Sequence, residues 1–573
     1  MPGNLWSTSA ALERRFCATL APTQMPRRTL LAAALAVACS APPTDGPLDV
    51  VIRNARVIDG TGSPWYRADV GIRGDEIVAI GDLSARAATR TIDAADRVVT
   101  PGFIDLMGTS TRPLLTEPNA AWSRLAQGIT TMMVGEGGSE APQSPTTLGD
   151  GATLPDGSKV SWRTFGEYFA LLEKAGVPMN LVHNVGAAQV REVAMGVEDR
   201  APAPDEMTRM KAMVDSAMLD GAVGISTALI YPPGAYATTE ELIELSKVAA
   251  ARGGVYFSHM RNESADLLTS IREVIRIAEE AKIPAHVYHL KAAGQENWPL
   301  IPQAIQLIAD ARARGLDVTA DIYPYIRNGI GLGSFLHPRH YAKGDSAFVP
   351  TLADPAVRRA LRQEVETTRD WENWYRHVGM NWDNVLITGA GPKVDQAFVG
   401  LSVRGVAKAR GIEEWDAFFD LVLNGPVDVA PQSMNEEQKH QALRAPFVAN
   451  EVDSPLADPA TTKSAHPRAF GAFPRLIAKY VREDKVLPLE QAVQRMTALP
   501  ANILRLRDRG RLAPGMKADL LVFHPDSIQD RATFEKPLQY ATGIDYMFVN
   551  GTALIDNGTR TTAKAGRVLR HGR

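Results

Sequence analysis

Four polar residues that follow apolar runs are of types that bind a metal ion or move a proton. Glu136 lies in "TTMMVGEG", His259 in "GVYFSHM", His289 in "AHVYHLK" and Asp453 in "PFVANEVDS". Zinc accepts imidazole nitrogen and carboxylate oxygen, and catalytic zinc sites keep three protein ligands plus water. Glu136, His259 and His289 would supply those ligands. A metal-bound hydroxide would attack the substrate, and Asp453 would act as general acid/base toward a leaving amine.

Each of these residues also has a structural interpretation. A lone His259 would be a hydrogen-bonded core histidine, Glu136 would cap the turn in its glycine-rich segment, and Asp453 would cap the helix that follows. Two histidines on consecutive apolar runs, each just before a polar turn, favour metal ligands. His286 is out of phase with His289, so we expect it to face the surrounding helices instead.

The elements that must position these residues are eight short apolar runs with helix-like segments between most of them. The runs are "GFIDLMG", "TTMMVGEG", "NLVHNVG", "AVGISTAL", "GVYFSHM", "AHVYHLK", "DVTADIYPY" and "PFVANEVDS". Repeated β–α units of this size predict an α/β fold with a parallel sheet, and eight of them predict a (β/α)8 TIM barrel over 101–504. Functional side chains of such barrels stand at the C-terminal ends of the strands.

Two further segments do not fit the β–α repeat. Residues from about 326 to 383 are too many for a plain loop and contain the charged helix-like "DPAVRRALRQEVETTRDWENW", so we expect an insertion there. The "NVLITG" that follows leaves the identity of the seventh strand open. Alternating apolar and polar residues in 48–100 and again in 505–573 predict one composite β domain built from both chain ends.

Residues 1–47 have the character of a leader. From Met25, two arginines precede an apolar run and small residues, as in a bacterial secretory signal. "AVAC" resembles a lipobox, with Cys39 as the lipidation site, so we expect export to the periplasm or a tether to the membrane. Cys17 and Cys39 are the two cysteines of the chain, and the rest therefore holds no disulfide, cysteine nucleophile or cysteine metal ligand.

Composition narrows the class of protein. The 573 residues are 45% hydrophobic and 22% charged, with a net charge of -3. This is ordinary for a soluble globular protein, and the interspersed charges argue against a nucleic-acid partner. No apolar run reaches the roughly 18–20 residues that a membrane span needs.

With these residues in place, the chain resembles the amidohydrolase superfamily, and within it the D-aminoacylase (N-acyl-D-amino-acid deacylase) group. The markers include "VVTPGFID", "SHMRNE", "HPRAFGAFPR" and "GMKADLLVF". The resemblance spans nearly everything from Leu48 to Arg570. It implies a barrel with a β-sandwich, strand-end histidines that match His259 and His289 as ligands of the tight metal, and a catalytic aspartate that matches Asp453. It also implies a small substrate with a free carboxylate, which Lys291 and Arg468 would bind, together with Tyr323 or Tyr325.

The chain departs from the family pattern at two places. Met107 and Thr109 replace the His-x-His of the first strand, and Glu136 stands where the family has a cysteine. We therefore expect one zinc ion rather than two, with Met107 and Thr109 lining the substrate pocket. For Arg468, a structural salt bridge is the alternative role.

The expected activity is hydrolysis of the amide of N-acyl, D-configured amino acids or related carboxylate-bearing amides. One alternative is a catalytically silent relative that binds a ligand at the cell envelope, which the missing histidine pair would favour. Another keeps the chemistry and changes the substrate to dipeptides, cyclic amides or lactones.

Overall fold

The computed structural model describes residues 46–149 and 151–572. The expected signal sequence from Met25 and the lipidation site Cys39 lie outside these residues. Among the helices that are described, none combines the length and the apolar character needed to cross a lipid bilayer.

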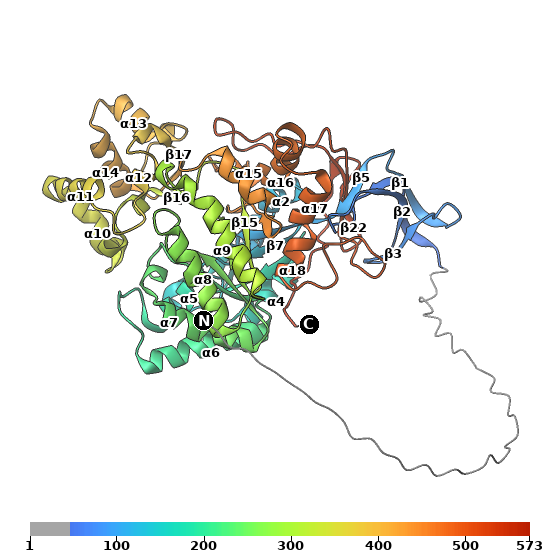
Figure 1. Ribbon diagram of the computed structural model, residues 1–573, viewed down its shortest axis with the longest axis horizontal. Helices are drawn as coiled ribbons and strands as arrows, with labels where there is room; N and C mark the ends of the chain where they lie inside the picture. Colours follow the sequence, from blue (N-terminus) through green and yellow to red (C-terminus); the bar gives the residue numbers. More distant parts are fainter. Residues whose placement is uncertain (1–45, 150, 573) are drawn as a thin grey trace, which may run out of the picture. The chain divides into compact units, whose positions relative to one another are not determined.

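Eight parallel strand positions form the barrel (Figure 1). They are β6 (Phe103–Gly108), β7 (Ile129–Val134), β10 (Asn180–His183) continued by β11 (Val185–Gly186), β12 (Gly224–Ala228), β13 (Val255–His259), β14 (Ala285–Val287), β15 (Val318–Ile322) and β19 (Val448–Asn450). Neighbouring strands pair in this order, and a parallel bridge between Gly108 and Ser454 joins the last strand position to the first. The eight apolar runs are thus the eight barrel strands, and the TIM-barrel prediction is confirmed.

Amphipathic helices follow the barrel strands. They include α5 (Ala187–Met195), α6 (Pro204–Asp220), α7 (Thr239–Ala251), α8 (Leu267–Ala281) and α9 (Ile301–Ala313). Helix α8 buries Ile271, Val274 and Ala278 at helical spacing, which gives it one apolar face toward the strands. After β19 the chain continues through α16 (Arg468–Arg475), the π-helical segment Leu476–Glu483, α17 (Leu489–Met496) and α18 (Ala498–Ile503).

The insertion forms a unit with its own apolar core. Its elements are β16 (Ile330–Gly331), α10 (Asp345–Phe348), α11 (Pro355–Thr367), α12 (Trp374–His377), β17 (Val385–Ala390), α13 (Val403–Arg410), α14 (Glu414–Asn424) and β18 (Val427–Pro431). Strand β17, the "NVLITG" run, pairs antiparallel with β18 and is no barrel strand. The insertion therefore continues to Pro431 instead of ending near residue 383, and α15 (Glu436–Arg444) leads back to β19.

Both chain ends contribute to one nine-stranded sheet. The N-terminal strands are β1 (Leu48–Val57), β2 (Tyr66–Arg73), β3 (Glu76–Gly81), β4 (Ala88–Asp93) and β5 (Val98–Pro101); the C-terminal strands are β20 (Leu520–Phe523), β21 (Ile544–Val549), β22 (Thr552–Asp556) and β23 (Thr559–Arg560). Strand β5 pairs antiparallel with β20, which joins the blue and red ends of the chain in Figure 1. Where a composite β-sandwich was expected from 48–100 and 505–573, the two chain ends build one nine-stranded sheet.

Candidate metal centre

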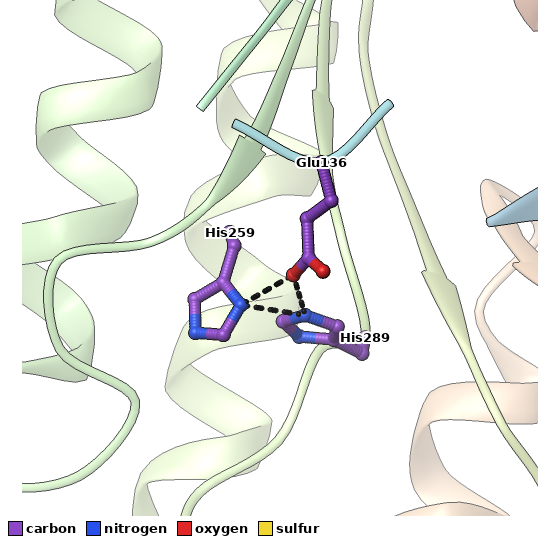
Figure 2. Close-up of side chains that lie close together, drawn as sticks. All are labelled: Glu136, His259 and His289. Carbon is purple, nitrogen blue, oxygen red and sulfur yellow. Dashed lines mark hydrogen bonds and ion pairs between the residues drawn. The ribbon is translucent and has the colours of Figure 1, made fainter. Parts of the chain in front are cut away.

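Three side chains converge at the C-terminal ends of the barrel strands (Figure 2). Glu136 Oε1 lies 2.6 Å from His259 Nδ1 and 3.3 Å from His289 Nε2, and the two ring nitrogens are 3.1 Å apart. Ligand bonds of about 2.0 Å to a tetrahedral zinc ion place ligand atoms about 3.3 Å from one another. Both the donor types and their separations therefore fit three ligands of one zinc ion.

His289 has a left-handed backbone conformation, which directs its side chain into this cluster. His289 has φ 37°, and its N–H donates to Asp321 Oδ1 at 2.6 Å. A non-glycine residue in this region is uncommon and is held there by its surroundings. His259, in contrast, is the last residue of the regular strand β13.

The expectation that His286 faces the helices was wrong. His286 is fully buried, with Nδ1 2.7 Å from Thr319 Oγ1 and Nε2 2.8 Å from Asp321 Oδ2. Its ring packs beside Tyr288, which belongs to the apolar cluster inside the barrel. Strand β14 ends at Val287 and the chain turns at His289, so the two-residue alternation does not connect His286 with His289.

The electrostatics of the three side chains favour a bound cation. Burial raises the pKa of Glu136, but its contacts with His259 and His289 outweigh that effect and lower the pKa to about 2. Burial and Lys291 lower the pKa of His289, while Glu263 and Glu136 raise it more strongly, to about 9. Without a metal ion, a proton on His289 offsets carboxylate charge, and a divalent ion would take the place of that proton.

Glu263 and Lys291 support the cluster from one side. Glu263 Oε1 lies 2.8 Å from His289 Nδ1 and 2.5 Å from Lys291 Nζ, and both side chains are buried. Such an acceptor fixes the ring orientation and tautomer of a metal-binding histidine. Glu263 was not among the predicted site residues, although its position in "SHMRNE", four residues after His259, was a usable signal.

Asp453 stands opposite this pair in an ion pair with Arg468. Asp453 Oδ2 lies 2.8 Å from Arg468 Nη1, and the Asp453 side chain is 14% exposed. Burial raises the pKa of Asp453, and the attraction of Arg468 offsets only part of that effect. Asp453 has φ 51° and its N–H donates to the carbonyl of Met107 at 3.0 Å. Arg468 thus has the alternative role expected for it, that of a salt-bridge residue, and its partner is Asp453.

A cavity of about 30 Å³ joins these groups. Its lining includes the three candidate ligands and Glu263, Lys291, Asp453, Tyr231, Tyr323 and Trp374. Arg468 lies behind this wall, with its guanidinium carbon 4.5 Å from the centre of the Tyr323 ring. Tyr231 and Trp374 were not among the predicted site residues.

Besides Arg468, three residues expected to contact substrate do not line this cavity. Met107 is buried in the apolar cluster inside the barrel, and Thr109 is half-buried outside the cavity lining. Tyr325 packs against Arg475 and His466. The expectation that Met107 and Thr109 line the pocket was therefore wrong, and of the two tyrosines only Tyr323 reaches the cavity.

Comparisons with known proteins agree with this architecture. The sequence profile described as "Amidohydrolase family" matches residues 457–570. The chain is 34% identical to N-acyl-D-glutamate deacylase of Alcaligenes xylosoxydans xylosoxydans over 91% of this chain and 96% of that protein, and 32% identical to D-aminoacylase of the same organism over 91% and 98%.

Among solved structures, N-acyl-D-glutamate deacylase of Bordetella bronchiseptica, complexed with zinc and a phosphonate inhibitor, superposes with a TM-score of 0.77 at 32% identity. That superposition covers 92% of this chain and 100% of the other. The structure of a D-aminoacylase gives a TM-score of 0.76 at 33% identity, covering 91% and 100%. These relatives support a metal-dependent hydrolase of C–N bonds in small molecules. The chain belongs to the amidohydrolase superfamily, in the group of the D-aminoacylases and N-acyl-D-glutamate deacylases.

Proposed function

We propose that this protein hydrolyses the amide bond of N-acyl-D-amino acids with one zinc ion held by Glu136, His259 and His289. The observation that carries the proposal is the convergence of three ligand atoms within 3.3 Å of one another, in one cavity with Asp453. The relatives named above are deacylases of this kind. A zinc ion held by these ligands supplies Lewis acidity for the amide carbonyl and the attacking water.

Asp453 is proposed as the general base and acid. Its carboxylate accepts a proton from the attacking water as the new C–O bond forms, and returns a proton to the amide nitrogen as the C–N bond breaks. The products are a carboxylic acid and a free amino acid. Burial raises the pKa of Asp453, and this shift makes the carboxyl group better able to return a proton to the amide nitrogen.

The substrate carboxylate is proposed to contact Lys291 and Tyr323. Both line the cavity, and Lys291 Nζ carries three donors, with Glu263 Oε1 at 2.5 Å and His289 Nδ1 at 2.7 Å. Arg468, stacked over the Tyr323 ring and paired with Asp453, adds positive charge to the same wall. Such a wall favours a substrate with an anionic group next to the scissile amide.

Two measurements on the purified protein test this function together. Metal analysis should find close to one zinc ion per chain, and a panel of N-acetyl-D- and N-acetyl-L-amino acids should show release of free amino acid from D substrates. A protein that holds no stoichiometric metal and releases no amino acid would be the silent ligand binder instead.

Export and lipidation at Cys39 are proposed from the leader sequence alone. Labelled palmitate should be incorporated into the full chain and not into the Cys39→Ala variant. An unlabelled protein in the cytosolic fraction would contradict this part of the proposal.

A further inference from the structure

A second, larger cavity of about 600 Å³ adjoins the metal centre. The barrel side contributes Tyr236, Arg261 and Asp266, and the insertion contributes Trp371 and Glu372. Trp374 lines both this cavity and the small one around the candidate ligands. Trp374 is therefore a wall that the two cavities share.

The lining of this cavity has more acidic than basic side chains. Five carboxylates line it, against two guanidinium groups; the carboxylates are Asp199, Asp266, Glu273, Asp370 and Glu372, and the cations are Arg261 and Arg339. Glu273 pairs with Arg261 at 3.0 Å, and Asp370 lies 3.7 Å from Arg339. Within residues 46–149 and 151–572, the remaining three carboxylates have no cationic side chain in ion-pair distance.

Glu372 is the group that points to a ligand. It is only 5% exposed, its Oε1 accepts the Glu263 N–H at 3.0 Å, and its Oε2 is buried without a hydrogen-bond partner. Burial and the neighbouring Glu263 raise the pKa of Glu372 to about 8, and a cation bound beside it would favour its charged form. The cavity lining also includes Tyr236 and Trp371, and aromatic rings attract organic cations.

A second metal ion is a weaker match for this place than an ammonium group. His259, Glu263 and Glu372 have donor atoms within 4.8 Å of one another. Since His259 directs Nδ1 to the candidate zinc ligands, its Nε2 carries the ring proton and faces Glu263 as an N–H. That nitrogen would bind a metal only after losing a second proton.

We propose that this cavity receives a cationic group of the substrate, either a basic side chain of the D-amino acid or the free amino group of an aminoacyl substituent. This rests on the proposed deacylase function and adds the charge class of its substrate. This preference would distinguish the chain from the relative named N-acyl-D-glutamate deacylase. The side-chain carboxylate of a D-glutamate substrate would lie near carboxylates that have no ion-pair partner in this cavity.

The test compares substrates that differ only in the cation. The side-chain arm pairs N-acetyl-D-lysine with N-acetyl-D-norleucine, and the acyl arm pairs glycyl-D-norleucine with N-acetyl-D-norleucine. We expect kcat/KM to favour the cation at least about tenfold in one arm, because a site with buried polar groups discriminates against an analogue that leaves them unpaired. N-acetyl-D-glutamate should be the poorest of the set.

Variants assign the preference to the cavity. Glu372→Gln and Asp266→Asn should each lower the ratio of kcat/KM between cationic and neutral substrate, while Glu279→Gln, an exposed change on α8, should leave it unaltered. Hydrolysis of norleucine substrates without a cation preference in either arm, or an unchanged ratio in Glu372→Gln, would overturn this inference and leave the deacylase function standing. If no substrate is hydrolysed, the deacylase function fails. In that case, calorimetry would measure the affinity of the protein for the cationic and the neutral compound of each pair, and equal affinities would overturn the inference as well.

Discussion

Asp453 and Arg468 form an ion pair at the mouth of the barrel, with Oδ2 2.8 Å from Nη1. The pair joins the third residue after the last barrel strand to the first residue of α16, and the Arg468 guanidinium also stacks on Tyr323. Burial raises the pKa of Asp453, and the attraction of Arg468 opposes that effect in part.

Asp453→Asn should lower kcat by about 10²–10⁴-fold, because the amide neither accepts the proton of the attacking water nor returns it to the leaving nitrogen. The metal content should not change, since Asp453 is not one of the three ligands. Steady-state kinetics on N-acetyl-D-amino acids and metal analysis of the same sample check both statements. Full turnover in Asp453→Asn would remove this residue from the mechanism.

His259→Ala and His289→Ala should each lose the bound zinc, because two protein ligands do not hold the ion as three do. Glu136→Cys should keep it, since a thiolate is an equally good zinc ligand at about 2.3 Å. His183→Phe serves as the matched control, because His183 is a buried histidine remote from the three ligand atoms. Metal analysis after dialysis decides, and stoichiometric zinc in both alanine variants would contradict the assignment.

The apolar runs of the sequence predicted the strands, and hence the positions of His259 and His289, because strand ends follow directly from local composition. The direction of a side chain beyond a strand end could not be predicted from local composition. His289 adopts a left-handed conformation that no periodicity encodes, and the alternation argument therefore misplaced His286. The Met107 side chain packs in the apolar cluster inside the barrel and does not line the cavity.

The insertion was harder to predict, because its contribution depends on tertiary packing. Trp374 and Glu372 reach the barrel mouth from a segment that packs around its own aromatic core. No spacing in the sequence relates Glu372 to Glu263, whose N–H it accepts across more than a hundred residues. Only the motif position of Glu263 offered a signal before the structure.

Stability should fall in mild acid through His183. Its ring lies 4.9 Å from that of Phe169, and burial lowers its pKa from 6.5 to about 3. Below pH 6.5, His183 binds a proton in the unfolded chain but not in the folded protein. The free energy of unfolding therefore falls as pH drops from 6.5 toward 3. The contribution is about 1.4 kcal/mol per pH unit, or roughly 2 kcal/mol between pH 6.5 and 5.

Urea unfolding at a series of pH values measures this contribution. His183→Phe keeps an aromatic ring beside Phe169 and has no proton to bind, so its pH dependence should be weaker by that amount. An identical pH dependence in the two proteins would show that His183 is not the responsible group.

The buried Asp105–Arg124 pair should control both stability and the position of Asp453. Asp105 Oδ1 accepts the N–H groups of Met107 and Val452 at 3.1 and 3.0 Å, and its Oδ2 lies 3.3 Å from Arg124 Nε. Arg124 also donates to the carbonyl of Ser454. Arg124→Met would leave Asp105 charged and unpaired in the barrel, which costs about 3–5 kcal/mol.

The double variant Asp105→Asn with Arg124→Met removes both charges and keeps an acceptor for the two backbone N–H groups. We expect it to recover much of the stability lost in Arg124→Met, as judged by denaturant unfolding. Since those N–H groups flank the turn that carries Asp453, kcat should recover in parallel with stability. A double variant as unstable as Arg124→Met would mean that the packing of Arg124, rather than its charge, supports this end of the barrel.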